Sequence, residues 1–224
     1  MTYSEALAHI HALEAFGSRP GLERVSALLS LLGDPHKKLA CVHVAGTNGK
    51  GSVCKMLAEA FAAAGYKTGL TISPYVTNFR ERIQVNGEMI PEAALAEYTE
   101  KTAATAAKMA DGPTEFEFIT ALAFSYFADQ GCGAVAVETG LGGRFDATNV
   151  LESPLVSVIA SISLDHMTVL GNTVSQIALE KCGIIKPGAP VVSYPVQEPD
   201  AAALIAQTAK ERGCELVIPD LSRL

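Results

Sequence analysis

A short apolar run followed by a glycine-rich loop constrains this chain more than any other feature. Residues 39–45 (Leu-Ala-Cys-Val-His-Val-Ala) have the composition of a buried strand, and the spacing from Val53 to Ala64 is helical. Between them, residues 46–52 read Gly-Thr-Asn-Gly-Lys-Gly-Ser. Strand, glycine loop and helix N-terminus, in that order, bind polyphosphate, because loop N–H groups and the helix dipole face the anion while Lys50 adds a full charge.

The loop is a shortened variant of the usual phosphate-binding loop. The usual pattern has a glycine five positions before the Gly-Lys pair, and this chain has Val44 there. Gly46, Gly49 and Gly51 permit positive φ angles and a close approach of phosphate oxygens. The alternative is a glycine-rich turn with one exposed lysine. The flanking strand and helix favour phosphate binding.

Composition limits the class of protein. The 224 residues suffice for one large or two small domains, and 49% of them are hydrophobic. The sequence contains no apolar run near the ~18–20 residues of a membrane helix, and its start does not resemble a signal peptide, so we expect a cytoplasmic protein without membrane contact. A net charge of −7 argues against a nucleic-acid partner. The five scattered cysteines include no C-x-x-C pair, which indicates reduced thiols.

Alternating strand and helix patterns predict an α/β fold with a mostly parallel sheet flanked by helices. Further strands are predicted at residues 68–73, 134–137, 155–161, 190–193 and 215–218, with an Asn-Gly hairpin at 83–90. Further helices are predicted in residues 3–32 (broken at 17–21) and at 91–110, 114–129, 173–181 and 201–212. We predict one ATP-binding domain over residues 1–224, of the P-loop NTPase class.

Side chains able to bind a metal follow three predicted strands. Ser73 ends the second strand, Glu138 directly follows the strand at 134–137, and His166 lies just beyond the strand at 155–161. Ligands gather at the carboxyl ends of parallel strands, and Mg²⁺ prefers carboxylates together with phosphate oxygens. The alternatives are a Ser-Pro turn at Ser73 and a histidine with a purely structural role at position 166.

Three other polar features have ordinary structural explanations. Glu115 and Glu117 lie in the first turn of a predicted helix, and their spacing alone favours a capping role. Lys181 ends a helix, where its charge complements the helix dipole. The loop Gly140-Leu141-Gly142-Gly143 differs from G-x-G-x-x-G, which excludes a Rossmann dinucleotide site.

Taken together, these motifs resemble the folylpolyglutamate synthase/dihydrofolate synthase family, a branch of the Mur-type ligases, and they cover the whole chain in the family's order. The segments that carry the resemblance are Gly-Ser-Arg-Pro-Gly-Leu-Glu-Arg-Val (17–25), His-Val-Ala-Gly-Thr-Asn-Gly-Lys-Gly-Ser (43–52), Ser-Pro-Tyr (73–75), Glu-Arg-Ile (81–83), Phe-Glu-Phe-Ile-Thr-Ala-Leu-Ala-Phe (116–124), Glu-Thr-Gly-Leu-Gly-Gly-Arg-Phe-Asp-Ala-Thr-Asn (138–149), Leu-Asp-His (164–166) and Glu-Lys-Cys-Gly-Ile-Ile-Lys (180–186). The fold implied is that of the Mur ligase central domain.

The resemblance implies an ATP-dependent amide ligation. A dihydropteroate or folate carboxylate attacks the γ-phosphate of ATP to give an acyl phosphate, and the amine of L-glutamate then displaces phosphate. By motif, the implied residues are Thr47, Asn48, Gly49, Lys50, Gly51 and Ser52 for ATP; Ser73, Glu138 and His166 for Mg²⁺; Thr114, Glu115, Phe116, Glu117, Phe145, Asp146 and Ala147 for the pteroate or folate; and Lys181 as a carbamylated metal-binding lysine. Lys50, His166 and Lys181 are the implied catalytic residues.

The chain departs from the family pattern in two respects. Tyr75 stands where many members have histidine, which removes an expected polar contact beside Ser73. Family members also continue into a separate C-terminal domain, so we expect a truncated chain that ligates poorly alone. The full-length family is expected to be monomeric, whereas an uncovered apolar face would favour self-association of the shorter chain.

Two other functions stay open at this level. The first is a Mur-type ligase with a different amino-acid-bearing substrate, against which the Phe-Glu-Phe stretch at 116–118 and the loop 141–146 favour folate. The second is a non-catalytic nucleotide-binding or interaction module. The sequence leaves open whether the first glutamate, later ones or both are added.

Overall fold

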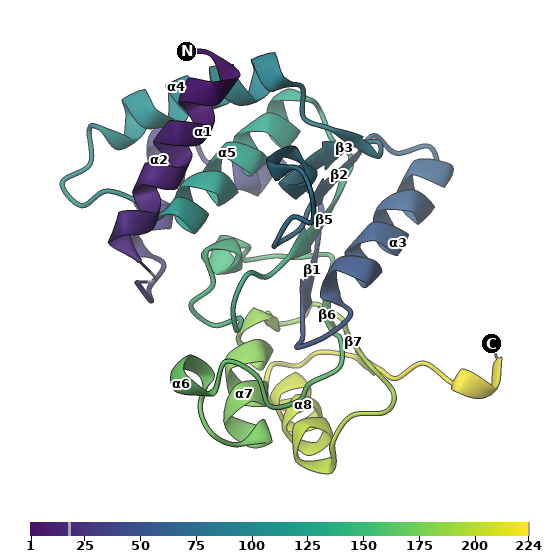
Figure 1. Cartoon of the computed structure of the whole chain (residues 1–224). Coiled ribbons are helices and arrows are strands. Elements are labelled where there is room, and N and C mark those ends of the chain that lie inside the picture. The colour runs from purple at the N-terminus through teal and green to yellow at the C-terminus, as the bar shows by residue number, and fades with distance from the viewer. Residues whose placement is uncertain (18, 224) are drawn as a thin grey trace.

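In the computed structural model, residues 1–17 and 19–223 are described, and they form layers of helix on both faces of one sheet (Figure 1). The strands are β1 (Cys41–Ala45), β2 (Thr68–Thr71), β3 (Ile83–Val85), β4 (Glu88–Met89), β5 (Ala134–Glu138), β6 (Val156–Ile159), β7 (Val191–Ser193) and β8 (Leu216–Val217). The α-helices are α1 (Tyr3–Ala12), α2 (Glu23–Leu31), α3 (Lys50–Ala63), α4 (Glu92–Ala106), α5 (Glu115–Asp129), α6 (Met167–Leu170), α7 (Val174–Lys181) and α8 (Pro199–Glu211). Short 3₁₀ helices are η1 (Leu13–Phe16), η2 (Pro35–Lys38), η3 (Phe79–Arg82), η4 (Ala147–Val150), η5 (Cys182–Ile184) and η6 (Leu221–Arg223).

The described strands join in the order β4-β3-β2-β5-β1-β6-β7-β8. The pairs from β2 to β8 are parallel, and β3 and β4 add an antiparallel edge. In the register of β1 with β5, Val44 lies opposite Glu138. The loop after β1 and the carboxylate that ends β5 therefore meet at one edge of the sheet, where ligands of open α/β sheets gather.

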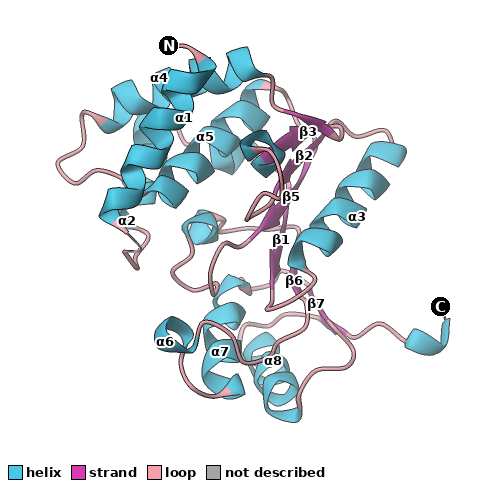
Figure 2. Ribbon diagram, in the orientation of Figure 1, coloured by secondary structure: helices cyan, strands magenta, loops and turns pink. Residues whose placement is uncertain are grey.

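Alternating side chains along the central strands bury two faces of the sheet. Val42 and Val44 pack with Cys54 of α3 on one face. On the other face, Val135 and Val137 belong to a larger core shared with α1, α2, α4 and α5. Figure 2 shows α3 alone on its side of the central strands and the four-helix group on the opposite side. A third core joins the end of β1 and β6 to α7 and α8.

The start of α5 is polar and is fixed by hydrogen bonds between neighbouring residues. The rest of the helix is apolar on all sides. Thr114 is the N-cap, and its side chain and that of Glu117 form a reciprocal capping box. Phe118, Phe124 and Phe127 are fully buried and occupy different sides of the helix. A helix with apolar residues all around it is stable only inside a core, which explains why α5 lies beneath α1, α2 and α4.

The predicted α/β class and the mostly parallel sheet are confirmed. The Asn-Gly hairpin is also confirmed, with φ angles of 51° at Asn86 and 81° at Gly87 that suit a type I′ turn. Helix α3 begins at Lys50 and not at Val53, because Gly49 takes a left-handed conformation as N-cap and leaves Lys50 in the first turn. Helix α6 and the 3₁₀ helices were not predicted, since elements of about one turn carry no readable periodicity.

Within the described part of the chain, none of the helices is long and apolar enough to cross a membrane. The cytoplasmic location stays a prediction. All five cysteines are free thiols, as their spacing predicts, and four of them are buried.

Candidate active site

The loop between β1 and α3 is anchored to the strand end of β6. Thr47 N–H and Asn48 N–H both donate to the Ser161 carbonyl, at 2.7 and 3.4 Å, and the Thr47 hydroxyl donates to the Ser163 carbonyl at 3.1 Å. These two loop N–H groups, expected to face phosphate, are thus bonded within the protein here. In the first turn of α3, the Gly51 N–H interacts with the Glu138 carboxylate and the Val53 N–H donates to the Gly49 carbonyl at 2.9 Å. The N–H groups of Lys50 and Ser52 are therefore those that helix geometry leaves available to an anion.

A buried carboxylate faces this helix start. Glu138 is 6% exposed, its Oε2 accepts the Ser73 N–H at 3.0 Å, and its Oε1 lies 3.9 Å from Lys50 Nζ. Burial raises the pKa of Glu138, while the Ser73 N–H bond and the Lys50 charge act in the opposite direction. A Cβ at Gly51 would lie 3.2 Å from Glu138 Oε2, so any larger side chain would press on this carboxylate. The Ser73 hydroxyl is buried nearby without a partner among the described residues.

Lys181 reaches the same loop from the other side. It is 3% exposed, and its Nζ donates to the Gly46 carbonyl at 2.7 Å. Burial, followed by the charge of Lys50, lowers the pKa of Lys181 to about 8. A helix-dipole role does not explain a buried ammonium, and a neutral amine is accessible near neutral pH.

His166 sits apart from these groups on the rim of a cavity. It has a left-handed backbone with φ of 46°, and its side chain is 58% exposed. Its ring Nε2 lies 3.6 Å from Asp165 Oδ2. His166 therefore does not touch Glu138 in this structure, although both face the same edge of the sheet.

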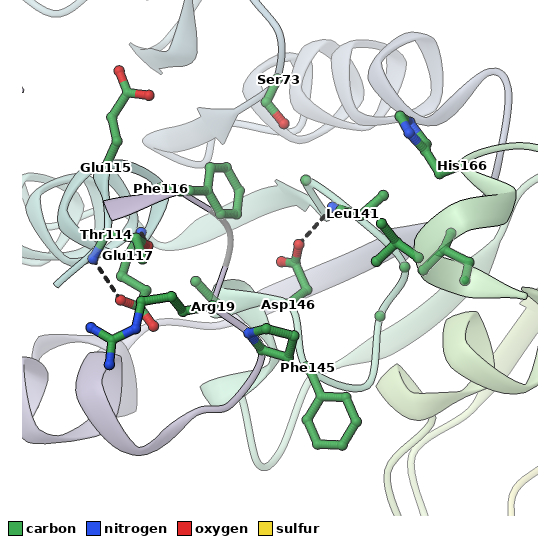
Figure 3. Close-up of a pocket in the computed structure, with 18 of the residues that line it drawn as sticks. Arg19, Ser73, Thr114, Glu115, Phe116, Glu117, Leu141, Phe145, Asp146 and His166 are labelled. Carbon is green, nitrogen blue, oxygen red and sulfur yellow. Dashed lines mark hydrogen bonds between the residues drawn. The ribbon is translucent and has the colours of Figure 1, made fainter. Parts of the chain in front are cut away.

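A cavity of about 730 Å³ opens beside the phosphate loop (Figure 3). Nine predicted site residues line it: Ser73, Thr114, Glu115, Phe116, Glu117, Phe145, Asp146, Ala147 and His166. Lys50, Glu138 and Lys181 lie outside this lining. The structure thus gathers the predicted substrate residues in one cavity and the predicted phosphate-binding residues beside it.

The predicted capping role of Glu117 is confirmed, and the buried carboxylate has a further partner. Glu117 accepts the Thr114 N–H at 2.7 Å. It also pairs with Arg24 of α2, whose Nε and Nη2 donate at 3.1 and 2.9 Å. Because these bonds occupy both carboxylate oxygens, Glu117 chiefly holds the cavity wall in place. Glu115 differs: it contacts His11 Nδ1 at 3.1 Å from a more open position.

Asp146 is held by a buried chain of hydrogen bonds that leads away from the cavity. Its Oδ2 accepts the Leu141 N–H at 2.8 Å, visible in Figure 3, and its Oδ1 accepts from the backbone and the hydroxyl of Thr148. The Thr148 oxygen lies 2.8 Å from His43 Nε2. Since the hydroxyl donates to Asp146, His43 must donate through Nε2–H. Burial lowers the pKa of His43 to about 3, which keeps the imidazole neutral.

Sequence reasoning missed the roles of Arg24, His43 and Arg82. His43 and Arg24 lie in segments quoted above, but their partners Thr148 and Glu117 are 105 and 93 residues away, so only the tertiary structure pairs them. Arg82 lines the cavity and belongs to the Glu-Arg-Ile segment, which was the one available signal.

Comparison with known proteins decides the family. No protein-family model matches the chain. The chain is 46% identical over 213 residues to the dihydrofolate synthase/folylpolyglutamate synthase of Bacillus subtilis, an alignment that covers 93% of this chain and 49% of that protein. The chain belongs to the folylpolyglutamate synthase/dihydrofolate synthase family. It spans about half the length of the curated relatives that it matches.

Solved structures of the family share this fold. A structure described as an FPGS-AMPPCP complex superposes with a TM-score of 0.92 at 40% identity, covering 99% of this chain and 54% of that one. An FPGS-AMPPCP-folate complex gives a TM-score of 0.91 at 40% identity, covering 99% and 55%. The Mur-type fold expected from the motifs is thereby confirmed.

The buried neutral His43 should make the chain sensitive to acid. Because its folded pKa of about 3 is below the unfolded value of 6.5, the unfolded chain binds the proton first as the pH falls. This contribution to stability is complete above pH 6.5 and is lost toward pH 3, at up to about 1.4 kcal/mol per pH unit. Urea unfolding of wild type and His43→Gln between pH 7.5 and 5 measures it. His9→Gln should retain the wild-type slope, and an unchanged slope in His43→Gln would contradict the assignment.

The Arg24–Glu117 pair should be essential to stability. Arg24→Met leaves a buried carboxylate without its cation and should lower the free energy of unfolding by about 3–5 kcal/mol. Adding Glu117→Gln should recover much of that loss, because the uncompensated charge is removed. Arg19→Met, at the exposed pair with Asp111, should cost less than about 1 kcal/mol. Urea unfolding at pH 7 of wild type, Arg24→Met, Glu117→Gln, the double variant and Arg19→Met tests this, and additive effects of the two single substitutions would refute direct coupling.

Proposed function

We propose that the protein is an ATP-dependent ligase that joins a pteroate or folate carboxylate to the amine of L-glutamate. The observation that carries the proposal is the position of Lys50 Nζ, 3.9 Å from the buried Glu138 carboxylate beside a cavity of about 730 Å³. A phosphate-binding loop next to a cavity suits transfer of a phosphoryl group to a bound acceptor. The named complexes of relatives with AMPPCP and folate support the same substrates here.

The chain's own groups supply binding and charge neutralisation. The Lys50 ammonium and the N–H groups of Lys50 and Ser52 would bind ATP phosphates, with Thr47 and Asn48 holding the loop in shape. The acceptor carboxylate would attack the γ-phosphate to form an acyl phosphate, with ADP as the leaving group, and the glutamate amine would then displace phosphate and lose a proton to form the amide. Phosphoryl transfer needs mostly positioning and neutralised charge, which a fixed lysine at a helix N-terminus provides.

Mg²⁺ fits the side chains at the sheet edge. The Glu138 carboxylate is buried, and the Ser73 hydroxyl beside it is buried without a partner, so an ion there would satisfy both. Bound Mg²⁺ would neutralise charge on the phosphates. His166, on the cavity rim, would join as a ligand only after its exposed side chain turns inward.

Lys181 is proposed as a carbamate. Its neutral Nζ would attack CO₂, forming a C–N bond and losing a proton, which converts a buried cation into an anion next to Lys50. Two observations support it: the side chain is 3% exposed, and its pKa is lowered to about 8. Both the burial and the lowered pKa disfavour a charged ammonium group at Lys181.

The pteroate or folate would occupy the cavity between Phe116, Phe145 and Asp146. Buried Asp146 presents a fixed carboxylate, and Phe116 packs so closely on Gly140 that a Cβ there would lie 2.6 Å from its ring. Because the curated relatives are about twice as long, we expect these 224 residues alone to bind nucleotide and acceptor but to ligate weakly. Whether one glutamate or several are added stays open, as does the oligomeric state.

Replacing Lys50 should disable nucleotide binding. Lys50→Ala should weaken MgATP binding at least about tenfold, since charge-assisted hydrogen bonds are worth about 1.5–3 kcal/mol. Lys55→Ala, at an exposed lysine on the same helix, should bind as the wild type does. Isothermal titration calorimetry measures both. Equal affinities in Lys50→Ala and wild type would overturn the proposed phosphate-binding role and the ligase function with it.

The carbamate should be visible by ¹³C NMR in ¹³C-bicarbonate. We expect one carbamate signal at pH 8 that weakens at lower pH, because protonation of the amine below about 8 removes the nucleophile. Lys181→Met should abolish the signal. Lys186→Met is the control. Lys186 is half-buried, and burial lowers its pKa as it lowers that of Lys181. A signal that survives Lys181→Met would reject this site.

A further inference from the structure

Arg82 is a cation in the cavity wall that has no anionic partner among the described residues. It ends η3 and lines the cavity together with Ser73 and Pro74. Across residues 1–17 and 19–223, no carboxylate oxygen lies within 4.0 Å of its guanidinium, and its Nε is buried without an acceptor. Arg82 is half-buried, and charges drawn out of water in proteins are normally paired, so an unpaired guanidinium in a cavity wall indicates a ligand.

The neighbouring arginines show that pairing is the rule in this region. Arg80, on the same 3₁₀ turn, donates through Nη1 to the Ile90 carbonyl at 3.3 Å and lies 3.8 Å from Glu92. Arg19 pairs with Asp111, and Arg24 with Glu117. The Nε of Arg80 is also buried without an acceptor among the described residues, so what sets Arg82 apart from all three is that no carboxylate lies within 4.0 Å of its guanidinium.

The carboxylates nearest to Arg82 are engaged elsewhere. Glu115 and Glu138 act on its pKa only at longer range, against the lowering by burial. Glu115 contacts His11 at 3.1 Å, and Glu138 accepts the Ser73 N–H. Neither carboxylate is positioned to neutralise the Arg82 guanidinium.

Two aromatic rings hold the guanidinium in place. Its Cζ lies 5.2 Å from the ring centroid of Tyr75 and 5.6 Å from that of Phe79, and these rings are 5.8 Å apart. These cation–π contacts hold the guanidinium, while its Nη groups make no hydrogen bond to the described residues and so stay available for a planar carboxylate. Tyr75 is also the position at which this chain departs from the family pattern. The contact between the Tyr75 ring and the Arg82 guanidinium is therefore a feature of this sequence.

The backbone of Arg82 is fixed at the edge of the sheet where phosphoryl transfer is proposed. The Ile72 N–H donates to the Arg82 carbonyl at 3.3 Å, directly after β2 and one residue before Ser73. Ser73 in turn binds Glu138, which faces Lys50. An anion at Arg82 would therefore lie on the cavity side nearest the phosphate loop.

We propose that Arg82 binds the carboxylate of the acceptor substrate through its guanidinium edge. This inference rests on the proposed function and adds the residue that selects a charged acceptor. The protein should prefer pteroate over the neutral pteroic acid amide, which has the same rings. The preference should be at least about tenfold, as expected for charge-assisted hydrogen bonds to a guanidinium.

Calorimetric titration of the 224-residue chain with pteroate and with its amide tests the assignment. Arg82→Gln should lose the preference for pteroate while binding of the amide stays within about twofold. Arg82→Lys should retain part of the preference, since a lysine provides charge without the bidentate fork. Arg80→Gln is the matched control on the same turn and should bind both compounds as the wild type does. Thermal unfolding of each variant confirms that it is folded.

Each outcome separates this inference from the proposed function. Loss of the preference in Arg82→Gln, and not in Arg80→Gln, supports the assignment. If wild type binds both compounds and Arg82→Gln keeps the preference, Arg82 is rejected while the acceptor cavity stands. If Arg82→Gln instead weakens MgATP binding tenfold, the residue binds nucleotide and the assignment is overturned. If wild type binds neither compound, the acceptor part of the proposed function and this inference both fail.

Discussion

The parallel pairing of β1 with β5 is the constraint on which the candidate site depends. It places Val44 opposite Glu138, so the strand that leads into the phosphate loop ends beside a carboxylate. Glu138 is almost fully buried, and a buried carboxylate persists only with partners that offset its desolvation. The Ser73 N–H and the Lys50 ammonium are those partners. The glycine at position 51 provides the space for them to meet.

The charges around this edge are balanced as a group and not in isolated pairs. Lys50 lies near Glu138, and its charge also lowers the pKa of Lys181, which is buried against the Gly46 carbonyl. Arg82 adds another cation, with no carboxylate oxygen of the described residues within 4.0 Å of its guanidinium. The buried carboxylates Glu138 and Asp146 offset part of the positive charge at this edge, and phosphate or carboxylate ligands would offset the rest.

The cavity wall is held by interactions that are mostly out of contact with a ligand. Arg24 fixes Glu117 at the start of α5, and the chain from His43 through Thr148 fixes Asp146. Both arrangements consist of buried hydrogen bonds with defined geometry, so they keep the cavity wall rigid. For the same reason, the stability of the fold is sensitive to mutation of these residues and to acid. Rigid walls are what a site needs when it positions two substrates for one transfer.

The sequence alone determined the α/β class, the strand–loop–helix at residues 39–64, the hairpin at 83–90 and the family. These features follow from local patterns: apolar periodicity, glycine spacing and turn chemistry act over a few residues and can be read directly. Only the tertiary structure decided that Thr47 and Asn48 bond to Ser161, that Glu117 is paired with Arg24, and that no carboxylate of the described residues pairs with Arg82. Those properties depend on segments some 90 to 115 residues apart in the chain, whose contact is set by strand order and packing and leaves no trace in local spacing.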